Sequence, residues 1–155
     1  MKSITLIISF VLFTSIANSQ EIQFKMQDFI KMAYFNIDEF ETYILKKGFY
    51  FSHTQKYTSF DVMHYQKEGN FITKSIANPQ TKIIRDVFYE TSSTDEYTFL
   101  KSQAQSLGFK YITSEKFKVD NNTIYHIYRK ENIEIKFYTS NRDTYLGYCM
   151  GIDIK

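Results

Sequence analysis

Apolar residues recur at helical spacing in two segments of the chain, residues 36–51 and 93–112. Positions i, i+3, i+4 and i+7 share one face of an α-helix, so each stripe predicts a helix packed on a core. The stripes are Ile37, Phe40 and Ile44 in the first segment, and Tyr97, Leu100, Ala104 and Leu107 in the second. A further stripe predicts a short extra helix before the first, at Met26, Phe29, Ile30 and Ala33.

Both helices are bounded by residues that favour helix ends. Asn36 with Glu39, and Ser93 with Glu96, have the spacing of a capping box, in which each side chain bonds the other residue's backbone amide. Each stripe is followed by a Gly-Phe pair, Gly48-Phe49 or Gly108-Phe109. Glycine there can adopt the left-handed conformation that ends a helix.

After each helix the hydrophobic period changes to two, which indicates β-strands. The predicted strands of the first copy are 50–56, 59–67, 71–77 and 82–90; those of the second are 109–117, 123–130, 133–139 and 145–154. The sequences "YQKEG" at 65–69 and "YRKEN" at 128–132 are the same turn in two copies, 63 positions apart. The fold class is therefore α+β, a duplicated α-β-β-β-β unit with the helices on one face of an antiparallel sheet of about eight strands, continuous or split.

The second of these turns sets which side chains share a face. A three-residue loop at 130–132, with Asn132 in the left-handed position, makes Arg129 face Ile133. That register predicts an inner face with Tyr125, Ile127, Ile135 and Phe137, and an outer face with His126, Tyr128, Glu134, Lys136 and Tyr138. A two-residue loop would mix polar and apolar residues on both faces, so the pattern favours the longer loop.

Residues 1–19 have the pattern of a secretory signal: Lys2, an apolar run from Ile4 to Phe13, and small residues before a cleavage site at Gln20. An uncleaved anchor is the alternative. The two repeats are then 20–92, including the short extra helix, and 93–155, together forming one compact domain. We expect an exported protein, periplasmic or extracellular, with no membrane span after cleavage.

Composition narrows the classes of partner. Without Lys2, 18 Lys and Arg residues stand against 17 Asp and Glu, which argues against nucleic acid as a partner. The single cysteine, Cys149, cannot form an internal disulfide, so stability must come from packing of the 15 Phe and 13 Tyr residues.

The order of one helix and four antiparallel strands, given twice over about residues 25–155, resembles the tandem-repeat β-lactamase inhibitor protein. That resemblance is one of architecture and implies a concave sheet surface that contacts an enzyme. The "NSQ" at 18–20 and "LKKGF" at 45–49 are similar to small exported proteins of Bacteroidota, which implies a cell-envelope location.

Candidate chemistry is sparse. Cys149 and His126 are predicted to point outward on the same face and form the one Cys/His pair that a small hydrolase could use. His53, His64 and His126 show no metal-ligand spacing, and no cofactor-binding motif occurs, so neither a metal nor a cofactor is expected.

The outer face of the last strand carries three small residues, Gly147, Cys149 and Gly151, because Leu146, Tyr148, Met150, Ile152 and Ile154 alternate inward. Tyr128, Tyr138 and Tyr145 are expected beside them, giving a shallow groove between tyrosines, and His126 is part of the same candidate binding face. Alternatively, the glycines make room for aromatic neighbours or mark bulges. We expect a non-enzymatic binding protein whose partner is another protein or a glycan. The alternatives are a self-associating structural protein and the small hydrolase.

Overall fold

The computed structural model describes residues 24–77, 84–116, 123–141 and 146–155. The helices are α1 (Met26–Tyr34), α2 (Ile37–Lys46) and α3 (Thr94–Ser106). The strands are β1 (Tyr50–Lys56), β2 (Phe60–Lys67), β3 (Asn70–Ala77), β4 (Asp86–Thr91), β5 (Lys110–Lys116), β6 (Ile124–Lys130), β7 (Ile133–Asn141) and β8 (Leu146–Ile154). The predicted signal segment and Tyr145 lie outside the described residues. Across the part of the chain that is described, no helix has the length and apolar character needed to cross a bilayer.

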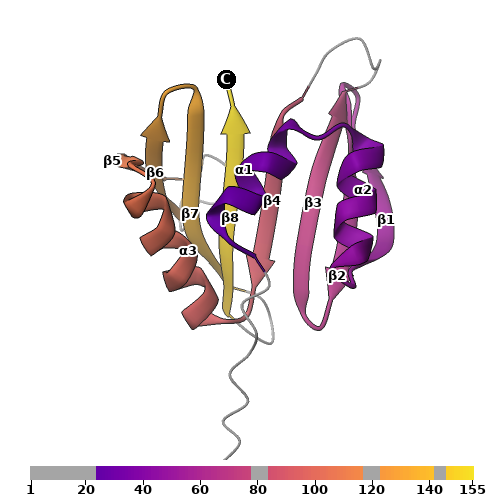
Figure 1. Cartoon of the computed structure of the whole chain (residues 1–155), viewed down its shortest axis with the longest axis horizontal. Helices are drawn as coiled ribbons and strands as arrows, with labels where there is room; N and C mark the ends of the chain where they lie inside the picture. The colour runs from indigo at the N-terminus through magenta and orange to yellow at the C-terminus, as the bar shows by residue number, and fades with distance from the viewer. Residues whose placement is uncertain (1–23, 78–83, 117–122, 142–145) are drawn as a thin grey trace, which may run out of the picture.

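All eight strands form one antiparallel sheet in the order β1-β2-β3-β4-β8-β7-β6-β5. Each repeat supplies one half of the sheet, and the halves join where β4 pairs with β8. The helices cover one face, with α2 over the β1–β3 half, α3 over the β5–β7 half and α1 across the centre (Figure 1). The predicted α+β class is confirmed, and the sheet is continuous.

The lysine of the repeated "YxKE" sequence bonds the C-terminal end of a helix in both halves of the structure. Lys67 and Lys130 donate from Nζ to the carbonyl oxygens of Lys47 and Leu107, at 3.0 and 2.8 Å. Lys47 and Leu107 are the C-cap residues of α2 and α3, where backbone carbonyls lack partners within the helix. A lysine there bonds such a carbonyl and interacts favourably with the helix dipole. Each turn thus holds its helix to the sheet.

The turn itself differs from the prediction. Lys130 pairs with Ile133, so the loop has two residues, and the positive φ, 52°, belongs to Glu131 instead of Asn132. The first copy has the same two-residue loop, with φ of 49° at Glu68 and 81° at Gly69. The three-residue loop was wrong because β6 carries large apolar side chains toward both faces, so alternation could not select the register.

The two helix N-termini also differ. Asn36 and Glu39 form the predicted capping box, with both hydrogen bonds at 3.0 Å. The Ser93 hydroxyl accepts from the Glu96 amide as predicted, but the Glu96 carboxylate turns away into the core. There Glu96 accepts hydrogen bonds from the hydroxyls of Tyr89 and Thr91, at 2.9 and 3.0 Å. The Ser93 amide donates instead to Thr91 Oγ1 at 3.1 Å, so the Ser93 cap forms without the reciprocal bond to Glu96.

A buried lysine ties α1 to the sheet. Lys74 Nζ donates to the carbonyl oxygens of Met32 and Ala33, in the last turn of α1, at 3.2 and 3.3 Å. It also donates to the backbone carbonyl of Asp86 at 3.3 Å. Burial lowers the pKa of the Lys74 ammonium, although the charge of Asp86 opposes this. Hydrophobic periodicity did not predict this role, because the helix carbonyls that Lys74 bonds are about 40 residues away in the sequence.

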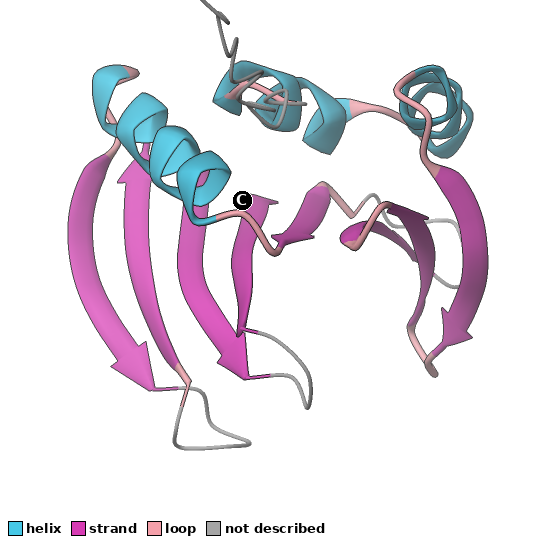
Figure 2. Ribbon diagram, turned by 90° about the horizontal axis from the view of Figure 1, so that it is seen from below, coloured by secondary structure: helices cyan, strands magenta, loops and turns pink. Residues whose placement is uncertain are grey.

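The face of the sheet opposite the helices, called the open face below, is concave. Both halves of the sheet bend away from the helix layer (Figure 2). The core between helices and sheet includes Phe29, Phe40, Tyr89, Ile135 and Met150. Ile127 and Cys149 are also buried but lie outside this core, which places buried apolar surface on the open face as well.

Candidate functional site

Four of the predicted site residues lie together on the open face: Tyr138, Gly147, Cys149 and Gly151. Cys149 on β8 pairs with Tyr138 on β7 and with Glu90 on β4. The inward set on β8 is also confirmed at its centre, since Met150 and Ile152 belong to the core. The alternation on β8 therefore gave the correct face.

Tyr128 and His126 lie on the opposite, helix-covered face, which corrects the predicted groove. Tyr128 pairs with Ile135, and its ring contacts Phe137 with centroids 5.6 Å apart. The two-residue loop shifts β6 by one position relative to the prediction and turns every β6 side chain over. Tyr125 and Ile127, expected inside, lie on the open face instead.

The same shift separates the suggested Cys/His pair. His126 is on the helix-covered side, where its Nδ1 lies 2.9 Å from Ser114 Oγ. Cys149 is buried on the open face beneath Tyr138. Because the sheet lies between the two side chains, they cannot act on one substrate.

A groove of about 570 Å³ runs across the open face from β5 to β4. Its lining residues come from five strands: Asp86, Val87, Phe88, Glu115, Lys116, Tyr125, Ile127, Lys136, Tyr138, Gly151, Ile152 and Asp153. Five adjacent strands span about 19 Å. A groove of that width follows from the concave curvature of the open face, because a flat sheet would have no depression there. Of the predicted site residues, Tyr138 and Gly151 line it.

The floor of the groove is open at Gly151. A Cβ added at Gly151 would meet no atom within 4 Å, whereas a Cβ at Gly147 would lie 2.6 Å from Glu90 Oε1. The two glycines therefore have different roles. Gly147 makes room for the buried carboxylate of Glu90, where the structural alternative expected an aromatic neighbour, and Gly151 leaves space that a ligand can fill.

Aromatic rings form one side of the groove. Tyr125 and Tyr138 meet edge to face with centroids 4.5 Å apart, and the Phe88 and Tyr138 centroids are 6.2 Å apart. Burial raises the pKa of Tyr138, and the neighbouring Cys149 and Tyr125 add to the effect. The Tyr138 hydroxyl therefore stays protonated at neutral pH.

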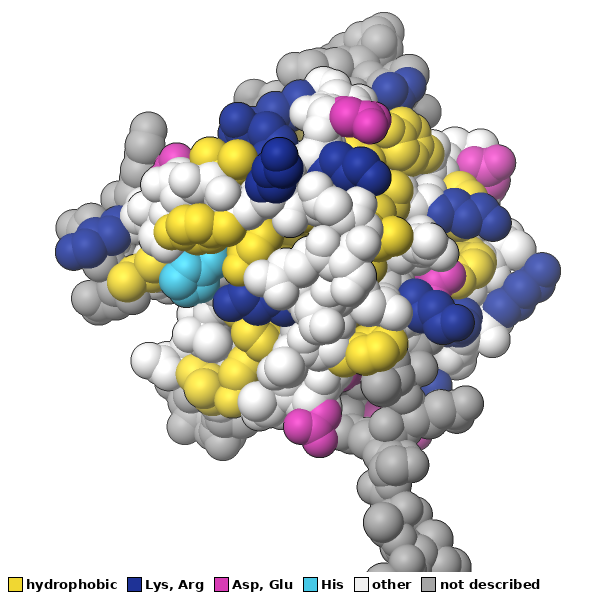
Figure 3. All heavy atoms as spheres, turned by 60° about the vertical axis from the view of Figure 1, so that its left-hand side comes forward, with side chains coloured by type: hydrophobic (Ala, Val, Ile, Leu, Met, Phe, Trp, Pro, Cys, Tyr) yellow, Lys and Arg dark blue, Asp and Glu magenta, His cyan; other side chains and the backbone are white. Residues whose placement is uncertain are grey.

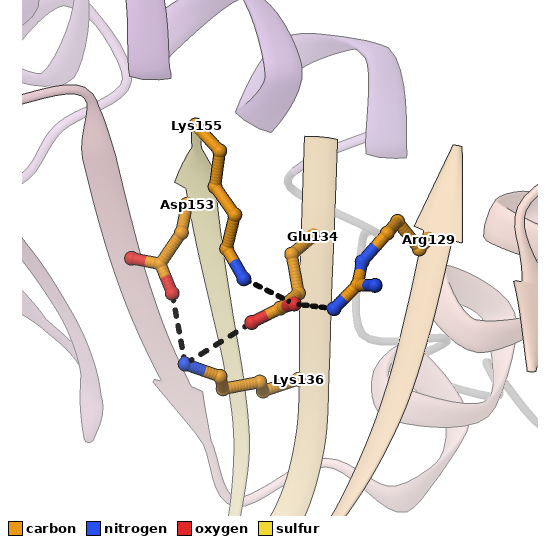
Figure 4. A network of polar contacts seen from close by, with 5 residues as sticks. All are labelled: Arg129, Glu134, Lys136, Asp153 and Lys155. Carbon is orange, nitrogen blue, oxygen red and sulfur yellow. Dashed lines mark hydrogen bonds and ion pairs between the residues drawn. The ribbon is translucent and has the colours of Figure 1, made fainter. Parts of the chain in front are cut away.

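A charged network adjoins the groove on β6, β7 and β8. Glu134 accepts hydrogen bonds from Arg129 and from Lys155 Nζ, and Lys136 Nζ lies 3.0 Å from Asp153 Oδ2 and 3.5 Å from Glu134 Oε1 (Figure 4). Burial alone would raise the pKa of Glu134, but the hydrogen bonds from Lys155 and Arg129 outweigh it and lower the pKa to about 2. Glu134 is therefore ionised at neutral pH, and it fixes Lys136 at the groove margin.

The two repeats have diverged at the groove. Positions 63 residues apart correspond, as Tyr65 and Tyr128 do. Tyr125 and Tyr138 have Val62 and Ser75 as their counterparts, and the counterpart of Gly151 is Phe88. Both tyrosines and the open floor thus belong to the second repeat, whereas the third ring, Phe88 on β4, comes from the first.

Two of the three histidines lie together, on β1 and β2, and the third, His126, lies on β6 in the other half of the sheet. His53 and His64 stack across β1 and β2 with centroids 4.3 Å apart, and burial followed by the charge of His53 lowers the pKa of His64. Among the described residues, no three His, Cys, Asp or Glu side chains come together in a way that could hold a metal ion. The stacked pair lies on β1 and β2, on the opposite half of the sheet from the groove.

Comparison with known proteins assigns no family to the chain: no family model, no curated protein and no solved structure matches it.

Proposed function

We propose that this protein is a non-enzymatic binding module whose groove receives a segment of another protein. The observation that carries the proposal is the open floor at Gly151, bounded by the rings of Phe88, Tyr125 and Tyr138. Strand-borne aromatic side chains offer large contact area at low entropic cost, which is typical of protein-binding surfaces.

Two further features support a binding role. The groove is built on paired strands instead of loops, so its shape is set before a partner arrives and less ordering entropy is lost on binding. Its residues also diverge from their counterparts in the first repeat, which the fold alone does not require. Export and the resemblance to the tandem-repeat inhibitor stay predictions, and the proposal depends on neither.

The test uses a substitution that fills the groove without disturbing the fold. Gly151→Ile adds a side chain where a Cβ meets no atom within 4 Å, in a strand position that suits β-branched residues. We expect the free energy of unfolding to stay the same or rise by about 0.5–1 kcal/mol. Partner binding should fall by more than tenfold, because the side chain occupies the partner's space.

The measurement is partner retention from envelope and medium fractions of the source organism, followed by titration with the identified, purified partner. Gln55→Ile is the matched control, since Gln55 lies on the same face on the distant strand β1 and does not line the groove. A partner that binds the parent and the Gln55→Ile variant but not the Gly151→Ile variant supports the proposal. Equal binding to all three proteins contradicts it.

Self-association is a second candidate, favoured by the positions of exposed apolar side chains. Four of them lie on the two edge strands: Tyr50 and Phe51 on β1, and Tyr111 and Ile112 on β5. The β5 side of the molecule shows apolar side chains at the surface among basic ones (Figure 3). Both edge strands also have a register shift, between Phe51 and His53 and between Tyr111 and Thr113, and such bulges hinder edge pairing.

Light scattering over a dilution series tests this candidate. If the β5 edge pairs with a second copy, the average mass rises with concentration, and Ile112→Lys returns it to the monomer value because a charge blunts the edge. A monomer mass at every concentration removes self-association and leaves the groove proposal unaffected.

A further inference from the structure

Two carboxylates face each other at one end of the two central strands of the sheet. Asp86 on β4 and Asp153 on β8 are a direct cross-strand pair, and both line the groove. Like charges directly opposite each other destabilise a sheet, so this pair requires a reason. The side chain of Asp153 remains 43% exposed, so the pair is accessible from the groove.

Groups of the chain itself balance this pair in part. Lys136 Nζ binds Asp153 at 3.0 Å but also lies 3.5 Å from Glu134, so its charge is shared. Asp86 Oδ1 accepts the backbone N–H of Ser75 at 2.9 Å. Lys74 approaches Asp86 from the helix side and binds its backbone carbonyl. Lys74 therefore does not occupy the groove.

The open floor lies next to this pair along the strands. Gly151 and Asp153 are two positions apart on β8, as are Phe88 and Asp86 on β4. Two residues of a strand span about 7 Å, a distance that the stem of a lysine or arginine side chain can cover. The rings of Phe88 and Tyr138 can hold such a stem, and their faces attract cations.

We propose that the groove binds an arginine or lysine side chain of the partner protein, with its stem over Gly151 and its charged end at Asp86 and Asp153. This inference rests on the proposed function and specifies the chemistry of the partner segment.

The charges of the lining residues favour a cation over an anion. Three carboxylates, Asp86, Glu115 and Asp153, line the groove with two ammonium groups, Lys116 and Lys136, and the ion pair of Lys136 with Asp153 leaves two carboxylates against one ammonium group. The groove margins are exposed at Glu115 and Lys116, whereas small-molecule sites enclose most of their ligand. A side chain that extends from a protein segment fits such an open groove better than a free amine.

The test is an NMR titration of the whole protein with the peptide Gly-Ala-Arg-Ala-Gly, and with matched peptides that carry Leu or Glu in place of Arg. We expect the Arg peptide to shift the amide signals of Phe88, Gly151 and Asp153 and the Glu peptide to leave them unchanged. The Asp86→Asn/Asp153→Asn variant should bind the Arg peptide about tenfold more weakly, since two charge-assisted contacts are lost. Asp38→Asn/Asp95→Asn, in the exposed first turns of α2 and α3 on the helix side, removes the same two charges and should bind as the parent does.

The outcomes separate this inference from the proposed function. Equal binding of the Leu and Arg peptides, or full binding by the double variant, overturns the cationic partner. The inference is also overturned if methylguanidine binds as tightly as the Arg peptide, or if Ca²⁺ and not the peptide shifts the same amide signals. If no peptide binds but Gly151→Ile still abolishes partner retention, the binding module stands and the cationic inference fails. Unchanged melting of the variants excludes unfolding as the cause.

Discussion

Replacing Tyr128 with alanine is expected to lower the free energy of unfolding by about 3–4 kcal/mol, a loss typical of a large aromatic side chain removed from a core. Tyr128 is 5% exposed on the helix-covered face. Its ring meets Phe137 and Tyr111 edge to face, and Lys101 of α3 lies over it. Truncation therefore leaves a cavity between α3 and the sheet.

Chemical denaturation of the Tyr128→Ala and Tyr138→Ala variants checks this prediction. Tyr138 lies on the open face and borders the groove, so its truncation should cost less stability and should weaken partner binding instead. If Tyr128→Ala were nearly neutral, the side chain would lie on the solvent side, as the three-residue loop required. The two variants thus report directly on the register of β6.

Acidification is expected to remove about 2–3 kcal/mol of stability between pH 5 and pH 2 through Glu134 alone. Hydrogen bonds from Lys155 and Arg129 overcome the burial of Glu134 and lower its pKa from 4.5 to about 2. The folded protein thus favours the ionised carboxylate, and this contribution is complete above the unfolded pKa and lost as pH falls through the folded pKa. Solvent weakens the ion pairs of Glu134 with Arg129 and Lys155, whose side chains are 44% and 58% exposed, and the expected loss of stability is reduced accordingly.

Glu134→Gln isolates this contribution. The variant should be less stable at pH 7, because three cations lose a buried partner, and its stability should depend less on pH below 5. Glu68→Gln, in the exposed β2–β3 turn, is the matched control and should keep the acid dependence of the parent. Urea denaturation at a series of pH values provides the measurement. An unchanged acid dependence in Glu134→Gln would show that other carboxylates cause the loss.

The local elements of this protein can be read from the amino-acid sequence. The caps at Asn36 and Ser93 and the glycines at 48 and 108 predicted where α2 and α3 begin and end, because these signals act within one helical turn. The strand alternation of β8 was also readable. Its inward residues, Met150 and Ile152, contact the core, and its outward residues are small.

The register of β6 was decided by the tertiary structure. Tyr128 is buried beneath α3, and Ile127 is buried on the open face. A strand with buried residues on both sides has no polar face, so alternation cannot distinguish a two-residue from a three-residue loop. The predicted groove therefore included Tyr128 and His126 and omitted Tyr125.

The remaining features of the site depend on contacts between residues distant in the sequence. The pairing of β4 with β8 brings Phe88 opposite Gly151 and Asp86 opposite Asp153, and no local signal predicts which strands of the two repeats will meet. Lys74 and Glu96 likewise have partners that folding brings to them. Caps and periodicity reflect interactions over a few residues, whereas this groove exists only where two halves of one sheet join.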